Sequence, residues 1–252
     1  MEITRRQALV RASVAPIVAS KALSALAGQV ADAQAATDAQ FTPPPSAPTD
    51  EELQLLASAV ESARRMSATQ LVQDARFLPL HAQPIFRQLV KAIARDSVLT
   101  IPRDEEPGTR IVVAGSIVGP SGRPVAGAVA YVYHTSAKGW YSDKAAHIRS
   151  WAGDARHSRL FGYLKTGQDG SFEVRTIRPG GYPRSMLAQH IHLEVEANAY
   201  VPLATELLFD DDPRLTAEQR DHAKREAFFI AAQSPGLQNK PTYRYRVTLE
   251  KA

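Results

Sequence analysis

Residues 189–195, with the sequence QHIHLEV, combine two patterns on one short segment. Every second residue from Ile191 to Val195 is apolar, which is the pattern of a β-strand with one face in a core. His190 and His192 therefore share the opposite face, with Cα atoms roughly 6–7 Å apart. Two imidazoles at this spacing can bind one metal ion at about 2.0–2.1 Å each. A pair of ordinary surface or core histidines is the alternative at this point.

Short β-type segments, separated by turns rich in glycine and proline, fill the chain from about residue 110 onward. Many short strands with such turns predict a mainly β chain that folds as an antiparallel β-sandwich. Residues 142–162 are polar and lack a pattern, so we expect a long loop there. The expected strands cover residues 111–118, 128–133, 172–176, 189–195, 203–209 and 242–250.

Two helical patterns precede the strands. A capping box at Thr49–Glu52 predicts the start of one helix, and Pro84 predicts the start of the second. Neither carries obvious chemistry, so we expect both to pack on the β domain or on a second subunit, which makes a homodimer plausible. The apolar residues expected on their packed faces are Leu53, Leu56, Ala57, Val60 and Ala63, followed by Ile85, Phe86, Leu89, Val90 and Ile93.

The composition limits which residues could bind a metal ion and which kinds of partner we expect. The chain has 252 residues, a formal net charge of +4 and no cysteine. Without thiolates, any metal must be held by histidine, carboxylate, tyrosine or water. The sequence has no apolar run of transmembrane length, so we expect no membrane span. It also lacks a basic stripe interleaved with aromatic residues, so we expect no nucleic-acid partner.

The first 35 residues have the features of an export signal. Residues 4–10, TRRQALV, resemble a twin-arginine motif, an alanine-rich stretch follows, and Ala33–Ala35 provides a small-residue cleavage pattern. We therefore expect an exported or periplasmic protein, with a retained amphipathic helix in a cytoplasmic protein as the alternative. The predicted organisation is an export signal at 1–35, a proline-rich linker at 36–48, a helical segment at 49–105 and a β-sandwich domain at 106–252.

Three groups of motifs follow one another along the β region. They are Gly115–Ala128 with Gly139-Trp140-Tyr141, then Thr166–Phe172 with Thr176–Pro183, and then His190-Ile191-His192 with Thr205–Phe209. Their order and spacing resemble the intradiol ring-cleavage dioxygenases, the group of catechol 1,2- and protocatechuate 3,4-dioxygenases. The resemblance covers about residues 108–213. It implies a prealbumin-like β-sandwich preceded by helices.

The resemblance also implies a non-haem Fe(III) ion. Its four ligands would be Tyr141, Tyr182, His190 and His192. Phenolate oxygen suits this hard cation: a free phenol has a pKa of about 10, but a bound cation removes the proton. The implied reaction uses O2 to open a small aromatic diol of the catechol type to a cis,cis-muconate-type diacid, with Tyr182 taking a substrate proton. Tyr131 and Tyr133 match no motif position, so we interpret them as packing residues of the sandwich.

The sequence departs from the family pattern at two catalytic positions. Leu187 stands three residues before His190, where the family has an arginine, and Arg184 and Arg178 are the nearest candidates for its role. Glu206 stands where the family has a glutamine. Its carboxylate would repel a dianionic substrate unless it is protonated or paired, for example with Arg184.

Two other function classes stay open. A non-catalytic β-sandwich that binds carbohydrate or protein would explain the strands and turns but not the ligand-type residues. A zinc hydrolase could use His190, His192 and Glu206, although tyrosine is an uncommon zinc ligand. Replacing Tyr141 by phenylalanine separates these classes, because only the iron enzyme depends on that phenol.

Overall fold

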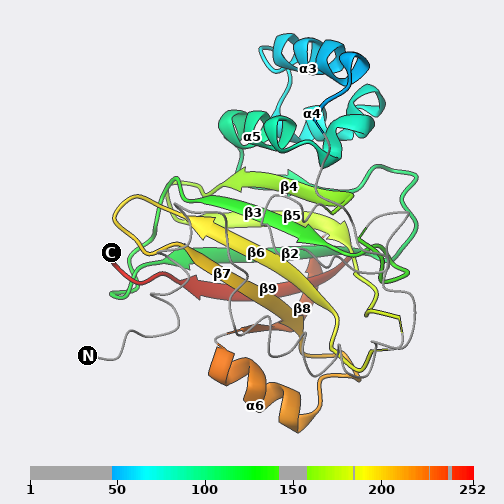
Figure 1. The fold of residues 1–252 in the computed structure, drawn as a ribbon. Helices are drawn as coiled ribbons and strands as arrows, with labels where there is room; N and C mark the ends of the chain where they lie inside the picture. Colours follow the sequence, from blue (N-terminus) through cyan, green and yellow to red (C-terminus); the bar gives the residue numbers. More distant parts are fainter. Residues whose placement is uncertain (1–46, 142–157, 184, 227, 238–239) are drawn as a thin grey trace.

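The computed structural model describes residues 47–141, 158–183, 185–226, 228–237 and 240–252. The strands in these ranges are β1 Val98–Thr100, β2 Arg110–Val118, β3 Val129–His134, β4 Leu160–Lys165, β5 Ser171–Ile177, β6 His190–Glu196, β7 Leu203–Phe209, β8 Phe229–Leu237 and β9 Lys240–Thr248. Their hydrogen-bonded order is β1-β5-β2-β9-β8-β7-β6-β3-β4. β8 joins the two halves of this order, which lie face to face in Figure 1 as a sandwich.

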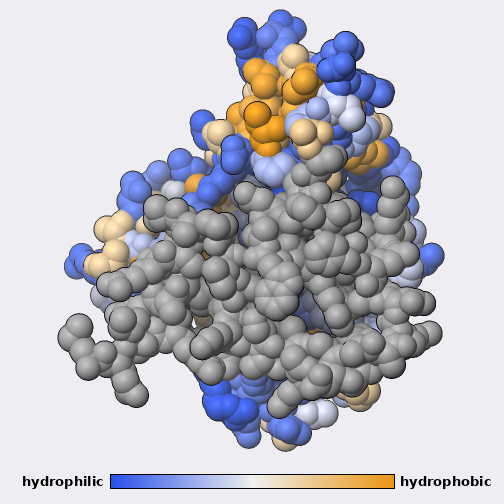
Figure 2. Space-filling model, in the orientation of Figure 1, coloured by the Kyte–Doolittle hydropathy of each residue, from blue (hydrophilic) through white to orange (hydrophobic). Residues whose placement is uncertain are grey.

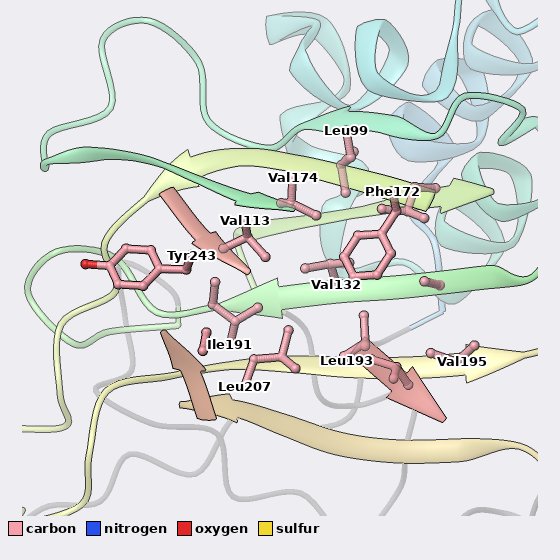
Figure 3. Packing of buried hydrophobic residues seen from close by; sticks show 14 of the residues in the cluster. Leu99, Val113, Val132, Phe172, Val174, Ile191, Leu193, Val195, Leu207 and Tyr243 are labelled. Carbon is pink, nitrogen blue, oxygen red and sulfur yellow. The ribbon is translucent and has the colours of Figure 1, made fainter. Parts of the chain in front are cut away.

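The core lies between the two sheets and follows the alternation that the sequence predicts. On β6, Ile191, Leu193 and Val195 are each at most 1% exposed and belong to the central cluster. Figure 3 shows them facing Val113 and Val174 from the opposite sheet. The predicted mainly β sandwich is therefore confirmed, and the histidines of β6 point away from its core.

Three strand pairs differ from the antiparallel arrangement that we expected. β1–β5, β2–β9 and β7–β8 are parallel, whereas the other pairs are antiparallel. Short turns allow only antiparallel neighbours, but a long connection can return the chain in either direction. β7 and β8, for example, are joined by a crossover that contains helix α6 (Ala217–Glu226).

The helices before the sandwich are α3 (Asp50–Ser62), α4 (Ala68–Gln73), the 3₁₀ helix η2 (Ala75–Ala82) and α5 (Pro84–Ile93). The capping box of α3 and the proline start of α5 are confirmed. α4 and η2 were not expected. Figure 1 shows α3, α4 and α5 on the side of the molecule where β4 lies, with α6 at the far side.

The expected packed face of α3 was partly wrong. Leu56 is buried, but Leu53 and Val60 are each 51% exposed, and Ala59 is buried instead. In α5, Phe86 and Val90 are buried as expected, whereas Ile85 is 55% exposed. The apolar residues of α3 are spread over more than one side of the helix. The side that carries Leu56 and Ala59 is the one buried where α3 packs against η2.

Several predicted features fall outside the described residues. They are the export signal, the linker up to residue 46, most of the long polar stretch, and Arg184. Among the helices that the structure describes, none combines the length and the apolar character needed to cross a membrane.

Candidate metal centre

The outer face of the β3–β4–β6–β7 sheet carries the candidate site. Because side chains alternate along a strand, the residues between the core positions of these strands share this face. One part of this outer face packs against the helices α3 to α5 and forms a second buried cluster, which includes Tyr133, Tyr141 and Phe161. On the other side α6 packs against Ala188 and Leu208 in a third cluster. The site lies between these two helical coverings.

Two glycine-containing loops bring Tyr141 and Tyr182 together. Gly139 has φ of 81°, a conformation that favours glycine. A Cβ there would lie 2.9 Å from the carbonyl carbon of Gly181, and a Cβ at Gly180 would lie 2.5 Å from the Ala137 oxygen. The two loops therefore touch backbone to backbone, which only glycine permits. This contact explains why each tyrosine follows a glycine by one or two residues.

The four predicted ligands form a continuous chain of close contacts. Tyr141 Oη lies 2.5 Å from Tyr182 Oη and 2.6 Å from His192 Nε2. Tyr182 Oη lies 2.9 Å from His190 Nε2. The structure thus brings all four predicted donor atoms to one point. They come from β6 and from two loops that are distant in sequence.

Each histidine presents its Nε2 atom to this point. His190 donates from Nδ1 to the Ala188 carbonyl oxygen at 2.8 Å, which leaves the Nε2 lone pair free for a ligand. His192 has Glu206 on its Nδ1 side, with Oε1 at 3.9 Å. Partners behind a ligating imidazole that fix its orientation are typical of metal sites. Glu206 therefore lies behind His192, not among the converging phenols.

The donor set fits a ferric ion. Burial, and to a lesser degree the neighbouring Tyr182, raise the pKa of the Tyr141 phenol well above its usual range. Without a cation this phenol stays protonated, whereas a bound trivalent ion would stabilise the phenolate. Two imidazoles and two phenols are a hard, mixed N/O ligand set with no thiolate. His190, His192 and Glu206 also offer ligand atoms within 4.8 Å of one another, but that grouping leaves the two phenols unused.

Arg178 is already engaged elsewhere. Its guanidinium donates to Gln189 Oε1 at 2.6 Å and to Asp211 Oδ1 at 2.9 Å, and it stacks 3.8 Å from the Phe209 ring centroid. This network secures the residue before His190 and does not offer a free charge to a substrate. Arg184, the other candidate, lies outside the described residues.

Tyr133 is the residue whose role our interpretation of the sequence missed. It belongs to the cluster on the helix side, not to the sandwich core, and its ring stacks on His192 with centroids 4.5 Å apart. The strand period already carried this signal, because Tyr131 and Tyr133 lie on the face opposite the core residues Ala130 and Val132.

A family model described as "Dioxygenase" matches residues 82–249 of the chain. The chain is 34% identical over 133 residues to catechol 1,2-dioxygenase 1 of Acinetobacter lwoffii, covering 46% of this chain and 41% of that protein. It is 32% identical over 145 residues to chlorocatechol 1,2-dioxygenase of Rhodococcus opacus, covering 50% of this chain and 54% of that protein. The chain thus spans about half the length of the curated relatives it matches.

Solved structures with a similar arrangement include 3-chlorocatechol 1,2-dioxygenase of Rhodococcus opacus 1CP. Its TM-score is 0.49 at 17% identity, covering 92% of this chain and 96% of that chain. An intradiol ring-cleavage dioxygenase of Tetranychus urticae gives a TM-score of 0.49 at 21% identity, covering 62% and 87% of the two chains.

Proposed function

Since the chain belongs to the intradiol ring-cleavage dioxygenase family, we propose that it is a non-haem Fe(III) enzyme that opens a catechol-type aromatic ring with O2. The ring would break between the two hydroxyl-bearing carbons. Both atoms of O2 would enter the product, a cis,cis-muconate-type diacid. The family match confirms the resemblance read from the sequence, and the reaction in this chain is the proposal.

The observation that carries this proposal is the convergence of two phenols and two imidazoles at Tyr141, Tyr182, His190 and His192. A carbohydrate- or protein-binding sandwich has no need for four buried or half-buried ligand groups at one point. A zinc hydrolase built on His190, His192 and Glu206 would leave the phenol contacts unexplained. The four-donor arrangement therefore favours iron.

The two tyrosines have different surroundings, which suits different roles. Tyr141 is 4% exposed and contacts His192, so it is held as a permanent ligand. Tyr182 is only partly buried and lies in the loop before Pro183, so it has room to move. When bound, a ferric ion would hold both substrate oxygens and promote their deprotonation. We assign to Tyr182 Oη the role of accepting one of these protons.

The proposal predicts a coloured protein. Visible absorption and metal analysis of one purified sample should show a tyrosinate-to-iron charge-transfer band and about one iron per chain, the stoichiometry that one four-donor centre holds. Tyr141→Phe removes a buried phenolate ligand and should abolish the band and O2 uptake with catechol. A colourless protein from an iron-sufficient culture would exclude the dioxygenase.

We also propose that the N-terminal helices mediate a homodimer. Leu53, Val60 and Ile85 on α3 and α5 are 51%, 51% and 55% exposed, and Figure 2 shows hydrophobic side chains gathered over these helices. Burying such side chains would stabilise a dimer by about 25 cal/mol per Å². Sedimentation should show a dimer that Leu53→Glu dissociates, and a monomeric wild type would contradict the proposal.

Export through a twin-arginine pathway is a further proposal, based on residues 4–10. That route carries folded proteins, which suits an enzyme loaded with its metal before transport. A reporter fusion should lose export when Arg5→Lys and Arg6→Lys are combined. Equal export of both forms would argue against it.

A further inference from the structure

Three tyrosine rings and one imidazole form a continuous stack on the outer face of the sheet. The rings of Tyr163 and Tyr131 lie 4.7 Å apart at an interplanar angle of 24°. Tyr131 and Tyr133 follow at 4.9 Å and 28°. Tyr133 and His192 complete the stack at 4.5 Å and 12°. The imidazole of a predicted metal ligand is thus the last ring of an aromatic stack that begins on β4.

Strand register produces this stack. Tyr133 pairs directly with His192 across β3 and β6, and Tyr131 pairs with Tyr163 across β3 and β4. Residues directly opposite on neighbouring strands lie within reach of each other's side chains, and so do aromatic residues two positions along. Any change that kept the strands but removed one ring would break the stack without changing the register.

The N-terminal helices hold the stack from behind. Phe77, Phe86 and Val90 of the helices share one buried cluster with Tyr133 and Phe161, and Tyr131 and Tyr163 pack against it. Arg87 of α5 is 5% exposed and places Nη1 3.4 Å from Tyr131 Oη. The stack is therefore clamped between the sheet and the helices, and its rings have little freedom to rotate.

Each histidine has a group on its Nδ1 side, and His192 has in addition the stacked ring of Tyr133. The His190 ring is set by the 2.8 Å hydrogen bond from Nδ1 to the Ala188 oxygen. At His192, Glu206 Oε1 stands 3.9 Å from Nδ1, behind the ring as seen from the four converging donor atoms. The nearly parallel Tyr133 ring restricts rotation of the His192 imidazole about its Cβ–Cγ bond. This restriction keeps Nε2 aimed at Tyr141 Oη.

We propose that Tyr133 is a positioning residue for the metal ligand His192, and that the Tyr163–Tyr131–Tyr133 stack transmits the packing of the N-terminal helices to the metal centre. This inference rests on the proposed iron site. It assigns to the helical segment a role in metal binding in addition to packing. Groups that orient a ligating imidazole typically change metal affinity by about 10- to 100-fold when they are removed.

The test compares variants at two neighbouring buried rings. Tyr133→Leu removes the ring stacked on His192, whereas Phe161→Leu removes a fully buried ring of the same cluster that pairs with Tyr133 across β3 and β4. Tyr133→Phe keeps the ring and is the conservative rescue. Fe(III) affinity by chelator competition, the charge-transfer band and the ferric EPR signal are measured for each, with thermal unfolding of the metal-free forms.

We expect Tyr133→Leu to lower Fe(III) affinity about tenfold or more and to change the EPR line shape. Tyr133→Phe should stay close to wild type. Phe161→Leu should lose thermal stability but change Fe(III) affinity and the spectra much less than Tyr133→Leu does, because the Phe161 ring meets Tyr131 edge-on at 6.1 Å and is not stacked on His192. If Tyr133→Leu fails to fold, Tyr131→Leu removes the next ring and should give a smaller shift in the same direction.

Equal affinity and identical spectra for Tyr133→Leu and Phe161→Leu would overturn the inference. A wild-type protein that binds no iron would instead overturn the proposed function, so the two failures are distinguishable.

Discussion

Gly139→Ala is the most direct test of how the two tyrosine loops meet. Gly139 has φ of 81°, and an added Cβ would lie 2.9 Å from the Gly181 carbonyl carbon and closer still to its oxygen. The alanine thus adds backbone strain and a clash with the loop that carries Tyr182. Both effects act next to the predicted ligands.

The cost of the backbone strain and the cost of the clash can be estimated separately. An alanine held in the left-handed region costs about 1–2 kcal/mol. Overpacking against a fixed backbone adds about 1–3 kcal/mol, so the free energy of unfolding should fall by roughly 3 kcal/mol. To relieve the clash, the loops must separate by roughly 1 Å. Metal–ligand distances tolerate only about 0.2 Å, so the affinity for Fe(III) should fall at least about tenfold.

Gly122→Ala is the matched control. Gly122 has φ of 76°, but a Cβ there would meet nothing within 4 Å. It should cost about 1–2 kcal/mol from strain alone and leave iron binding unchanged. Urea unfolding and chelator competition on both variants separate strain from clash. If Gly139→Ala bound iron as tightly as Gly122→Ala does, the close approach of the loops would not be what holds Tyr141 and Tyr182 together.

Three further predictions concern side chains around the site. Burial lowers the pKa of His134 from 6.5 to about 4. Between these two pH values the unfolded chain binds a proton at this histidine and the folded chain does not. The free energy of unfolding therefore falls as the pH falls through this range. Urea unfolding at pH 7 and pH 4.5 should therefore show a drop about 2 kcal/mol larger in wild type than in His134→Gln, and equal drops would contradict this. Glu206→Gln should weaken Fe(III) binding about tenfold while keeping the colour, whereas complete loss of metal would favour Glu206 as a direct ligand. Arg178→Met should destabilise the fold by roughly 3 kcal/mol in urea unfolding without raising the KM for catechol, and a raised KM would show that Arg178 contacts substrate.

The sequence predicted six of the described strands, β2, β3, β5, β6, β7 and β9, and missed β1, β4 and β8. The expectation of a loop over residues 142–162 was wrong at its end, because β4 begins at Leu160. β6 and the second half of β9 alternate polar and apolar residues along the sequence, so their faces could be assigned in advance. β4 is buried on both faces along most of its length, and therefore shows no alternation. β8 contains Pro235 and Gly236, a pair of residues that is typical of a turn and not of a strand. Alternation assigns the faces of a strand only when the residues on its two faces differ in polarity.

Some residues of the candidate site could be placed from the sequence alone, and others could not. Spacing alone placed His190 and His192 on one face, because strand geometry fixes it. Nothing in the spacing joins Tyr141 to Tyr182, since their loops meet only in the folded chain, and the resemblance to a family supplied that link. The stacked Tyr133 depends on the register between β3 and β6, which no local pattern reveals.

The parallel pairing of β2 with β9 also bears on how the chain folds. It joins Val112 to Thr242, so one of the widest loops in the molecule must close before the second sheet is complete. Contacts between such distant residues make folding slow, typically milliseconds to seconds for β-rich domains. The strands and loops that carry the four donor residues are all synthesised before β9. A chain still under synthesis therefore holds every predicted iron ligand while β2 lacks one of its neighbours.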